Sequence, residues 1–181
     1  MKIEERWLAF ARLFALVTVI IISIFIYTLR DRADELAVYG YPGIFLISLF
    51  TNATILLPAP GVAIIFAMGA VFNPLYVGIA AGTGGALGEL CGYLAGFSGQ
   101  AIVEKVKLYK HMTRWVGKNG FVTILILAAL PNPAFDVAGV AAGALKMPVP
   151  QFLLAAWIGV TIKMILFACA GAHSIRWVLD K

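Results

Sequence analysis

Long apolar runs alternate with short polar segments along this chain. Residues 13–29 contain no charged side chain, and residues 30–35 close the run with five charged ones. At about 1.5 Å per residue such a run is long enough to cross the hydrocarbon of a bilayer. We predict an N-terminal transmembrane anchor with its interfacial loop over residues 1–35, retained rather than cleaved, and a membrane domain over residues 36–181.

Two further apolar blocks, residues 43–72 and 121–145, are each interrupted by a pair of prolines. Each proline removes a backbone N–H donor and prevents the helix from continuing. The arms on either side are short, so we predict two membrane-embedded, re-entrant helical hairpins rather than two spanning helices. The tip residues are Pro58, Pro60 and Gly61 in the first hairpin and Pro131 and Pro133 in the second.

Two other apolar stretches, residues 74–98 and 151–172, are long enough for full spans. The first is rich in glycine at spacings of three and four, which places Gly85, Gly88, Gly92 and Gly96 on one helix face. Small residues on such a face allow a neighbouring helix to pack closely. Between the spans, residues 99–119 separate an apolar stripe from a basic one, which predicts an amphipathic interfacial linker with Trp115 as a headgroup anchor.

The broken pattern occurs twice at a nearly constant offset. Pro58 and Pro131 are 73 positions apart, whereas Pro74 and Pro148, like Gly85 and Gly159, are 74 apart. The chain thus contains two copies of a hairpin followed by a long helix, at about 41–98 and about 120–173. Counting the crossings makes the copies inverted, and the basic residues agree with eight inside and four outside. Interrupted segments in paired inverted copies indicate a transport site near the midplane.

Composition supports a membrane location. The chain is 62% hydrophobic and 13% charged, far from the roughly 25% charged residues of soluble domains. Its net charge of +5 is best explained by topology and anionic headgroups, so nucleic acid is not an expected partner. Cys91 and Cys169 lie in apolar runs without a metal or redox motif. We find no catalytic constellation, and we predict neither an enzyme nor a cofactor or metal site.

Three ionisable residues, Glu89, Asp136 and Lys163, fall inside the apolar stretches. A charge at the centre of a membrane helix costs about 2.5–3.5 kcal/mol, so each needs a partner or a wet cavity. Glu89 and Lys163 are 74 positions apart and therefore equivalent in the two copies. We hypothesise an ion pair between them across the repeat interface. A purely structural role for this pair is an equally good interpretation.

Asp136 follows the second hairpin tip. It is either a carboxylate that binds a proton, a cation or a cationic headgroup, or the N-cap of the second arm. For Asn52, local hydrogen bonding is favoured over contact with a substrate, and for Tyr93 a hydrogen bond to Glu89 and interior packing are equally good interpretations. The candidate substrate- or ion-binding residues are Asp136, Glu89, Lys163, Asn132 and Asn52.

Several motifs together resemble the DedA family, also called SNARE-associated Golgi or VTT-domain proteins. They are Pro58-x-Pro60-Gly61, Gly85-x-x-Gly88-Glu89-x-x-x-Tyr93-x-x-Gly96, and the segment from Ala142-Gly143 through Lys146-Met147-Pro148 to Trp157-Ile158-Gly159. The resemblance covers residues 40–171. It implies opposed re-entrant hairpins and movement of lipids between leaflets, coupled in bacterial members to ion gradients.

The sequence departs from the bacterial pattern, because Val62 stands where an acid is usual and Ala128 and Ala134 stand where arginines are usual. Lys163 is a candidate to supply the positive charge that those arginines would carry. Asp136 is a candidate marker of a divergent branch of the family. From the resemblance we expect a lipid flippase or scramblase for polyprenyl phosphate or phospholipid, with protons or sodium as candidate coupling ions. A non-transporting scaffold or assembly factor is the alternative. The expected location is a bacterial or archaeal cell (inner) membrane, where an oligomer is also compatible with the sequence.

Overall fold

The computed structural model describes residues 33–53, 60–98, 107–132 and 134–179. Every element within these ranges is a helix, which confirms the all-α prediction. The predicted N-terminal anchor and the tip residues Pro58 and Pro133 lie outside the described residues. In chain order the helices are α2 (Ala33–Ala53), α3 (Pro60–Val71), α4 (Pro74–Gly88), α5 (Leu90–Phe97), α6 (Lys107–Ala129), α7 (Ala134–Ala144) and α8 (Val149–Leu179).

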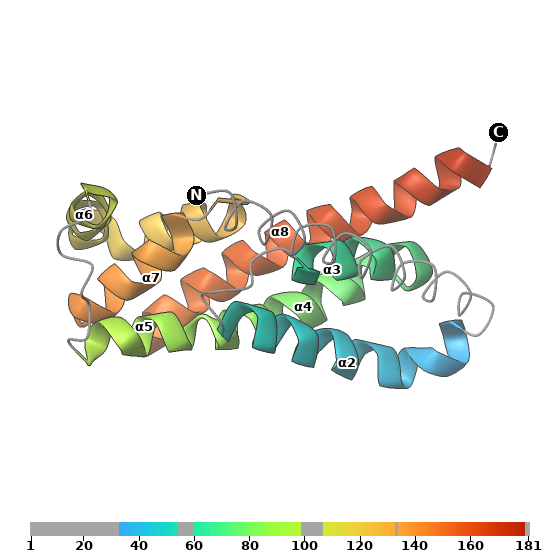
Figure 1. Ribbon diagram of the computed structural model, residues 1–181, viewed down its shortest axis with the longest axis horizontal. Helices are drawn as coiled ribbons and strands as arrows, with labels where there is room; N and C mark the ends of the chain where they lie inside the picture. The colour runs from blue at the N-terminus through green and yellow to red at the C-terminus, as the bar shows by residue number, and fades with distance from the viewer. Residues whose placement is uncertain (1–32, 54–59, 99–106, 133, 180–181) are drawn as a thin grey trace, which may run out of the picture.

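The longest described helix, α8, runs along most of the molecule (Figure 1). Helices α3, α4 and α6 contact α8 directly. Helix α2 packs on α4, and α7 packs on both α5 and α6. The second half of the chain therefore supplies the central helix α8, and α3 and α4 from the first half pack along it.

Helices α4 and α8 begin at or beside the prolines that mark the sequence repeat. Pro74 is the first residue of α4, where a missing N–H is harmless, and the side chain of Asn73 accepts a hydrogen bond of 3.0 Å from the backbone of Leu75. Helix α8 begins one residue after Pro148. The turn before it passes through Lys146, which has a φ of 54° in the left-handed region that often ends a helix.

The predicted single span over residues 74–98 is instead two helices, α4 and α5, that meet at Glu89. The hydrogen-bond ladder continues through the break, because the Glu89 amide donates to Gly85 and its carbonyl accepts from Tyr93, at 3.0 and 3.1 Å. The break is therefore a bend and not a reversal. Glycines on both sides of Glu89 explain the bend, because a chain without Cβ atoms deforms at low cost.

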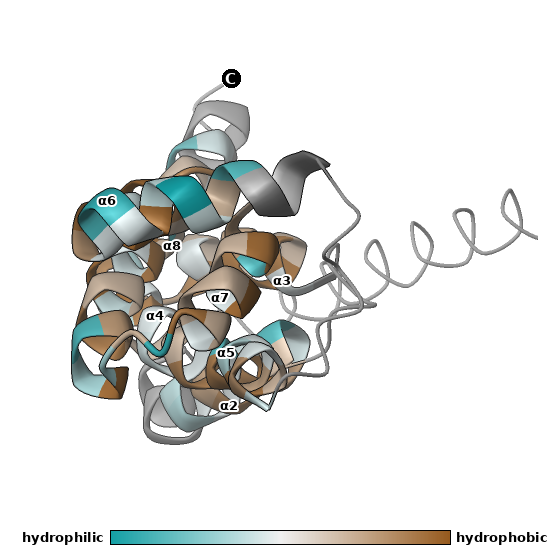
Figure 2. Cartoon of the chain, turned by 90° about the vertical axis from the view of Figure 1, so that its left-hand side faces the viewer, coloured by the Kyte–Doolittle hydropathy of each residue, from teal (hydrophilic) through white to brown (hydrophobic). Residues whose placement is uncertain are grey.

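Helix α6 also contains a break, at Asn119, whose φ of −149° and ψ of 72° are not helical. Before the break, Met112 and Val116 are buried while Trp115 and Lys118 are exposed. In Figure 2 much of the ribbon of α6 is teal, the colour of hydrophilic residues. The break coincides with the end of the predicted amphipathic linker, and the part after it corresponds to the predicted first arm of the second hairpin.

Contacts between the two halves of the chain occur in matched sets. Helix α3 packs on α8 much as α7 packs on α5, with glycines at each close approach. The closest pairs are Phe66 with Gly171 and Gly69 with Ala168 in one set, and Val140 with Gly96 and Gly143 with Tyr93 in the other. Adding 74 to the numbers of Phe66 and Gly69 gives Val140 and Gly143. Subtracting 74 from the numbers of Gly171 and Ala168 gives the positions one residue after Gly96 and Tyr93. Two copies related by a two-fold axis would make such contacts.

Among the described helices, one stretch, Val149–Ser174, has the length and hydropathy of a membrane span. Helices α3 and α7 contain 12 and 11 residues, or about 17 Å at 1.5 Å per residue, against a hydrocarbon thickness of about 30 Å. Large apolar side chains such as Phe50 and Leu166, which are 64% and 63% exposed, cover the outer surface. The molecule thus presents to its surroundings the kind of apolar surface that a bilayer covers.

Candidate functional site

The three ionisable residues predicted within the membrane lie on three different helical segments. Glu89, at the bend between α4 and α5, is only 5% exposed. Asp136, in the first turn of α7, and Lys163, in the middle of α8, are half-buried. These residues thus come from both halves of the chain, with one carboxylate from the first half and a carboxylate and an ammonium group from the second.

The fold brings these three side chains within range of one another's charge. Lys163 interacts electrostatically with both carboxylates, and Glu89 also interacts with Asp136. The Nζ atom of Lys163 lies 5.6 Å from the centroid of the Phe135 ring, next to Asp136 in sequence. An ammonium group over an aromatic face is a favourable cation–π arrangement, and it is stronger away from water. We call Glu89, Asp136 and Lys163 the charged cluster.

Glu89 and Lys163 form no direct ion pair within the described part of the chain, contrary to our hypothesis. A hydrogen bond of 3.0 Å joins Trp157 of α8 to Thr83 of α4, and these two residues are themselves 74 positions apart. The helices are antiparallel there, since Gly82 meets Thr161 whereas Gly78 meets Ile165.

Equivalent residues of α4 and α8 therefore do not lie opposite each other. Gly82 meets Thr161, and from that contact Glu89 lies seven positions further along the chain, while Lys163 lies two positions further in the opposite direction. Their charges still interact, but through space and not by direct contact.

Asp136 is not the N-cap of α7, because it lies two residues inside the helix that begins at Ala134. Asn132 supplies the corresponding contact, since its Oδ1 atom accepts a hydrogen bond of 2.9 Å from the Ala134 amide. Its Nδ2 atom donates to the carbonyl groups of Leu127 and Leu130, each at 3.2 Å. Asn132 thus fixes the turn between α6 and α7.

The polar residues of α2 use their hydrogen bonds within the protein. The buried hydroxyl of Ser48 donates to the Ala81 carbonyl of α4 at 2.6 Å. Asn52 donates to the Ser48 carbonyl at 2.7 Å, which is the local bonding favoured for it from the sequence. Ser48 was not among the predicted residues, since a single serine within an apolar run gives no signal of a contact with a distant helix.

Tyr93 connects α5 to the turn between α7 and α8. Its hydroxyl donates to the Met147 carbonyl at 2.5 Å, rather than to Glu89, and its ring packs against Phe152 with centroids 4.9 Å apart. The phenol is thus both packed and hydrogen-bonded, and it leaves Glu89 free of this partner. No local sequence signal identifies Met147, because the contact depends on how the two copies meet.

Three of the four glycines predicted to pack helices lie at close approaches. A Cβ atom added to Gly88 would collide with the backbone of α2, one at Gly96 would overlap the Val140 carbonyl of α7, and one at Gly85 would press on Val160 and Ser48. Gly92 is the exception, because a Cβ atom there would meet nothing within 4 Å among the described residues.

The described residues among the predicted hairpin tips lie at or beside connections between helices. Gly61 is buried against the side chain of Thr51 on the preceding arm, and Pro60 is the first residue of α3. Pro131 is exposed between α6 and α7. Among the described residues, no group of three or more His, Cys, Asp or Glu side chains is placed to hold a metal ion.

Bundled apolar helices, an apolar outer surface and a buried charged cluster define a helical membrane protein whose polar chemistry lies inside. The sequence profile of the VTT domain matches residues 59–173, more than half of the chain. The chain therefore belongs to the VTT-domain family of membrane proteins, which confirms the resemblance seen in the sequence.

Two similar proteins from Arabidopsis thaliana are the vacuole membrane proteins KMS2 and KMS1. They are 52% and 48% identical to this chain over 42 residues, which is 23% of this chain and 10% of each plant protein. The similar segment thus spans about a tenth of the length of these relatives. No solved structure matches the chain. The relatives do not test the expected bacterial or archaeal cell membrane, which stays a prediction.

Proposed function

We propose that this protein is a lipid flippase or scramblase, with a polyprenyl phosphate or a phospholipid as substrate, and that the charged cluster lines its transport path. The observation that carries this proposal is the convergence of Glu89, Asp136 and Lys163 among apolar helices from both repeats. A polar headgroup crossing a bilayer needs charged and hydrogen-bonding partners at a depth where hydrocarbon offers none.

The energetics of the cluster support a functional role. Each ionised side chain within a membrane costs about 2.5–3.5 kcal/mol even on the lenient insertion scale. An apolar replacement of a buried ion pair is often as stable as the pair itself, so stability alone is a weak reason to keep such charges. Intramembrane charges that lie close together commonly mark paths for ions or substrates.

The packing of the two halves supports an inverted repeat around the site. The matched contacts of α3 with α8 and of α7 with α5 are those of a two-fold arrangement, and the second arms of both hairpins are too short to span. Paired broken segments in inverted copies characterise transport sites near the midplane. The re-entrant path of each hairpin is part of this proposal.

The composition of the cluster suggests how transport is coupled. Two carboxylates and one ammonium group leave one negative charge, which a proton or a sodium ion can neutralise inside the membrane. Lys163 offers a positive charge to a phosphate group when that ion is bound. The basic part of α6 before Asn119 adds Arg114 and Lys118 at an exposed surface, where anionic headgroups gather.

The scaffold alternative has less support from the structure. In a scaffold, the glycine-rich face of residues 85–99 would pack against a helix of a partner protein. The chain itself occupies that face at two places, because α2 packs against Gly88 and α7 against Gly96, and among the described glycines of the face Gly92 alone has no neighbour within 4 Å.

The test is translocation of fluorescent phospholipids in liposomes that contain the purified protein. We expect lipid movement faster than in protein-free liposomes for at least one headgroup, with or without a proton gradient. Unchanged movement for several headgroups, polyprenyl phosphate included, would reject the proposal and favour the scaffold.

A further inference from the structure

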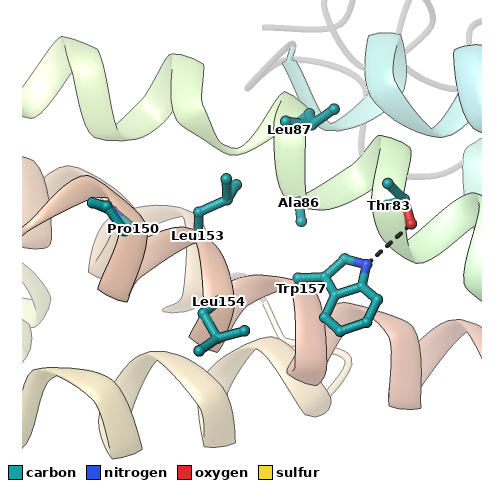
Figure 3. Close-up of a pocket in the computed structure, with 7 residues that line it drawn as sticks. All are labelled: Thr83, Ala86, Leu87, Pro150, Leu153, Leu154 and Trp157. Carbon is teal, nitrogen blue, oxygen red and sulfur yellow. Dashed lines mark hydrogen bonds between the residues drawn. The ribbon is translucent and has the colours of Figure 1, made fainter.

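A groove of about 360 Å³ lies between α4 and α8 on the outside of the molecule (Figure 3). Ala86 and Leu87 of α4 form one wall, and Pro150, Leu153 and Leu154 of α8 form the other. The volume falls within the range of about 300–1,000 Å³ that is common for small-ligand sites. The groove does not include the charged cluster, so it needs an occupant of its own.

The polar side-chain atoms of the groove wall are already paired with each other or with the backbone. Trp157 closes one end, and its indole N–H donates to the hydroxyl of Thr83 at 3.0 Å, as Figure 3 shows. That hydroxyl in turn donates to the Ile79 carbonyl at 2.8 Å. The groove therefore offers no free side-chain donor or acceptor to a headgroup, a peptide or water, and it is suited to hydrocarbon.

The position of the groove identifies the source of that hydrocarbon. It lies along α8, within the stretch Val149–Ser174 that can span a membrane. Leu154, Trp157 and Leu87 on its rim are 51%, 39% and 36% exposed, so the groove opens to the surroundings. In a bilayer those surroundings are acyl chains, which are as apolar as the leucines of the wall.

We propose that this groove is a binding site for one acyl chain of a membrane lipid, held between α4 and α8 with its path limited by the Thr83–Trp157 pair. The inference rests on the membrane location of the family and not on lipid transport, because a lipid can bind here without being moved.

The test uses the fluorescence of Trp157 in the full-length chain. Replacement of Trp7, Trp115 and Trp177 by Phe leaves Trp157 as the single tryptophan. The protein is reconstituted in phosphatidylcholine vesicles with or without bromine on the acyl chains, and the ratio of the two emissions measures contact between bromine and the indole. Leu87→Phe and Leu153→Phe fill the groove from opposite walls, and Ala170→Phe adds the same ring at an exposed position of α8 outside it.

We expect strong quenching in the unfilled protein and in Ala170→Phe, and quenching at least twofold weaker in both filled variants. Leu154→Phe, at an exposed rim position, replaces either filled variant if circular dichroism shows that it does not fold. Equal quenching in all folded variants would mean only a general lipid shell, and would overturn the proposal. Absence of quenching in the unfilled protein would mean that residues 13–29 or a second copy covers the groove, which would also overturn it.

Discussion

Glycines along α4 and α5 have very different surroundings although the sequence spaces them alike. Gly96 lets the backbone of α7 come into contact at Val140, whereas four residues earlier a Cβ atom at Gly92 would have no described residue within 4 Å. At the first position the missing side chain is a packing requirement. At the second it only weakens a helix, because glycine is a poor helix former. These two residues form a matched pair for a test at the residue scale.

We predict that Gly96→Ala destabilises the protein by about 1–3 kcal/mol, as overpacking does elsewhere. We predict that Gly92→Ala leaves stability unchanged or raises it by up to about 1 kcal/mol, since alanine favours the helix. Thermal unfolding in detergent measures both. Equal melting temperatures for the two variants would show that α5 and α7 do not pack at Gly96.

Between elements, a few buried polar contacts fix how neighbouring helices meet. Ser48 ties α2 to α4, Asn132 shapes the turn between α6 and α7, and Tyr93 joins α5 to the turn before α8. Each contact satisfies a backbone or side-chain group that would otherwise be costly to bury. The Tyr93 contact is the most informative, because it joins the two copies of the repeat.

We predict that Tyr93→Phe destabilises the fold by about 1–3 kcal/mol, because the buried Met147 carbonyl loses its donor while the ring packing is kept. Tyr76→Phe is the control, since Tyr76 is 57% exposed and its loss of a hydroxyl should change stability by less than about 0.5 kcal/mol. Chemical unfolding of the purified variants measures the difference. A Tyr93→Phe protein as stable as wild type would contradict the hydrogen bond.

The sequence predicted elements better than contacts. Prolines and apolar runs located the start of α4 and the end of the amphipathic segment near Asn119, because these depend on local backbone chemistry. The bend at Glu89, the role of Asn132 and the separation of Glu89 from Lys163 were missed. Each depends on how distant helices cross, and the repeat offset alone does not tell on which side of the crossing two equivalent residues lie.

At the scale of the whole molecule, α8 and the α4–α5 pair lie at the centre. Helix α3 of the first half packs on α8, and α7 of the second half packs on α5. The contacts of α3 with α8 match those of α7 with α5. If the halves are inverted copies, the turn at Asn73 and the turn at Lys146, which follow the first and second hairpins, face opposite sides of the membrane. Both residues are exposed and therefore suitable for labelling.

We predict that Asn73→Cys and Lys146→Cys, in a background with Cys91 and Cys169 replaced by Ala, react with an impermeant maleimide from opposite sides of oriented vesicles. Lys118→Cys should react from the same side as Lys146→Cys, because both belong to the predicted inner surface. Labelling of Asn73→Cys and Lys146→Cys from the same side would reject the inverted arrangement.

The charged cluster is the central claim, and lipid translocation by its variants tests it most directly. In liposomes we predict rates at least tenfold below wild type for Glu89→Gln, Asp136→Asn and Lys163→Met, each shown to fold by circular dichroism. The control Cys91→Ser, at an exposed position two residues from Glu89, should keep the wild-type rate. Wild-type rates in all three folded cluster variants would contradict the account, because lipids would then cross without using these charges.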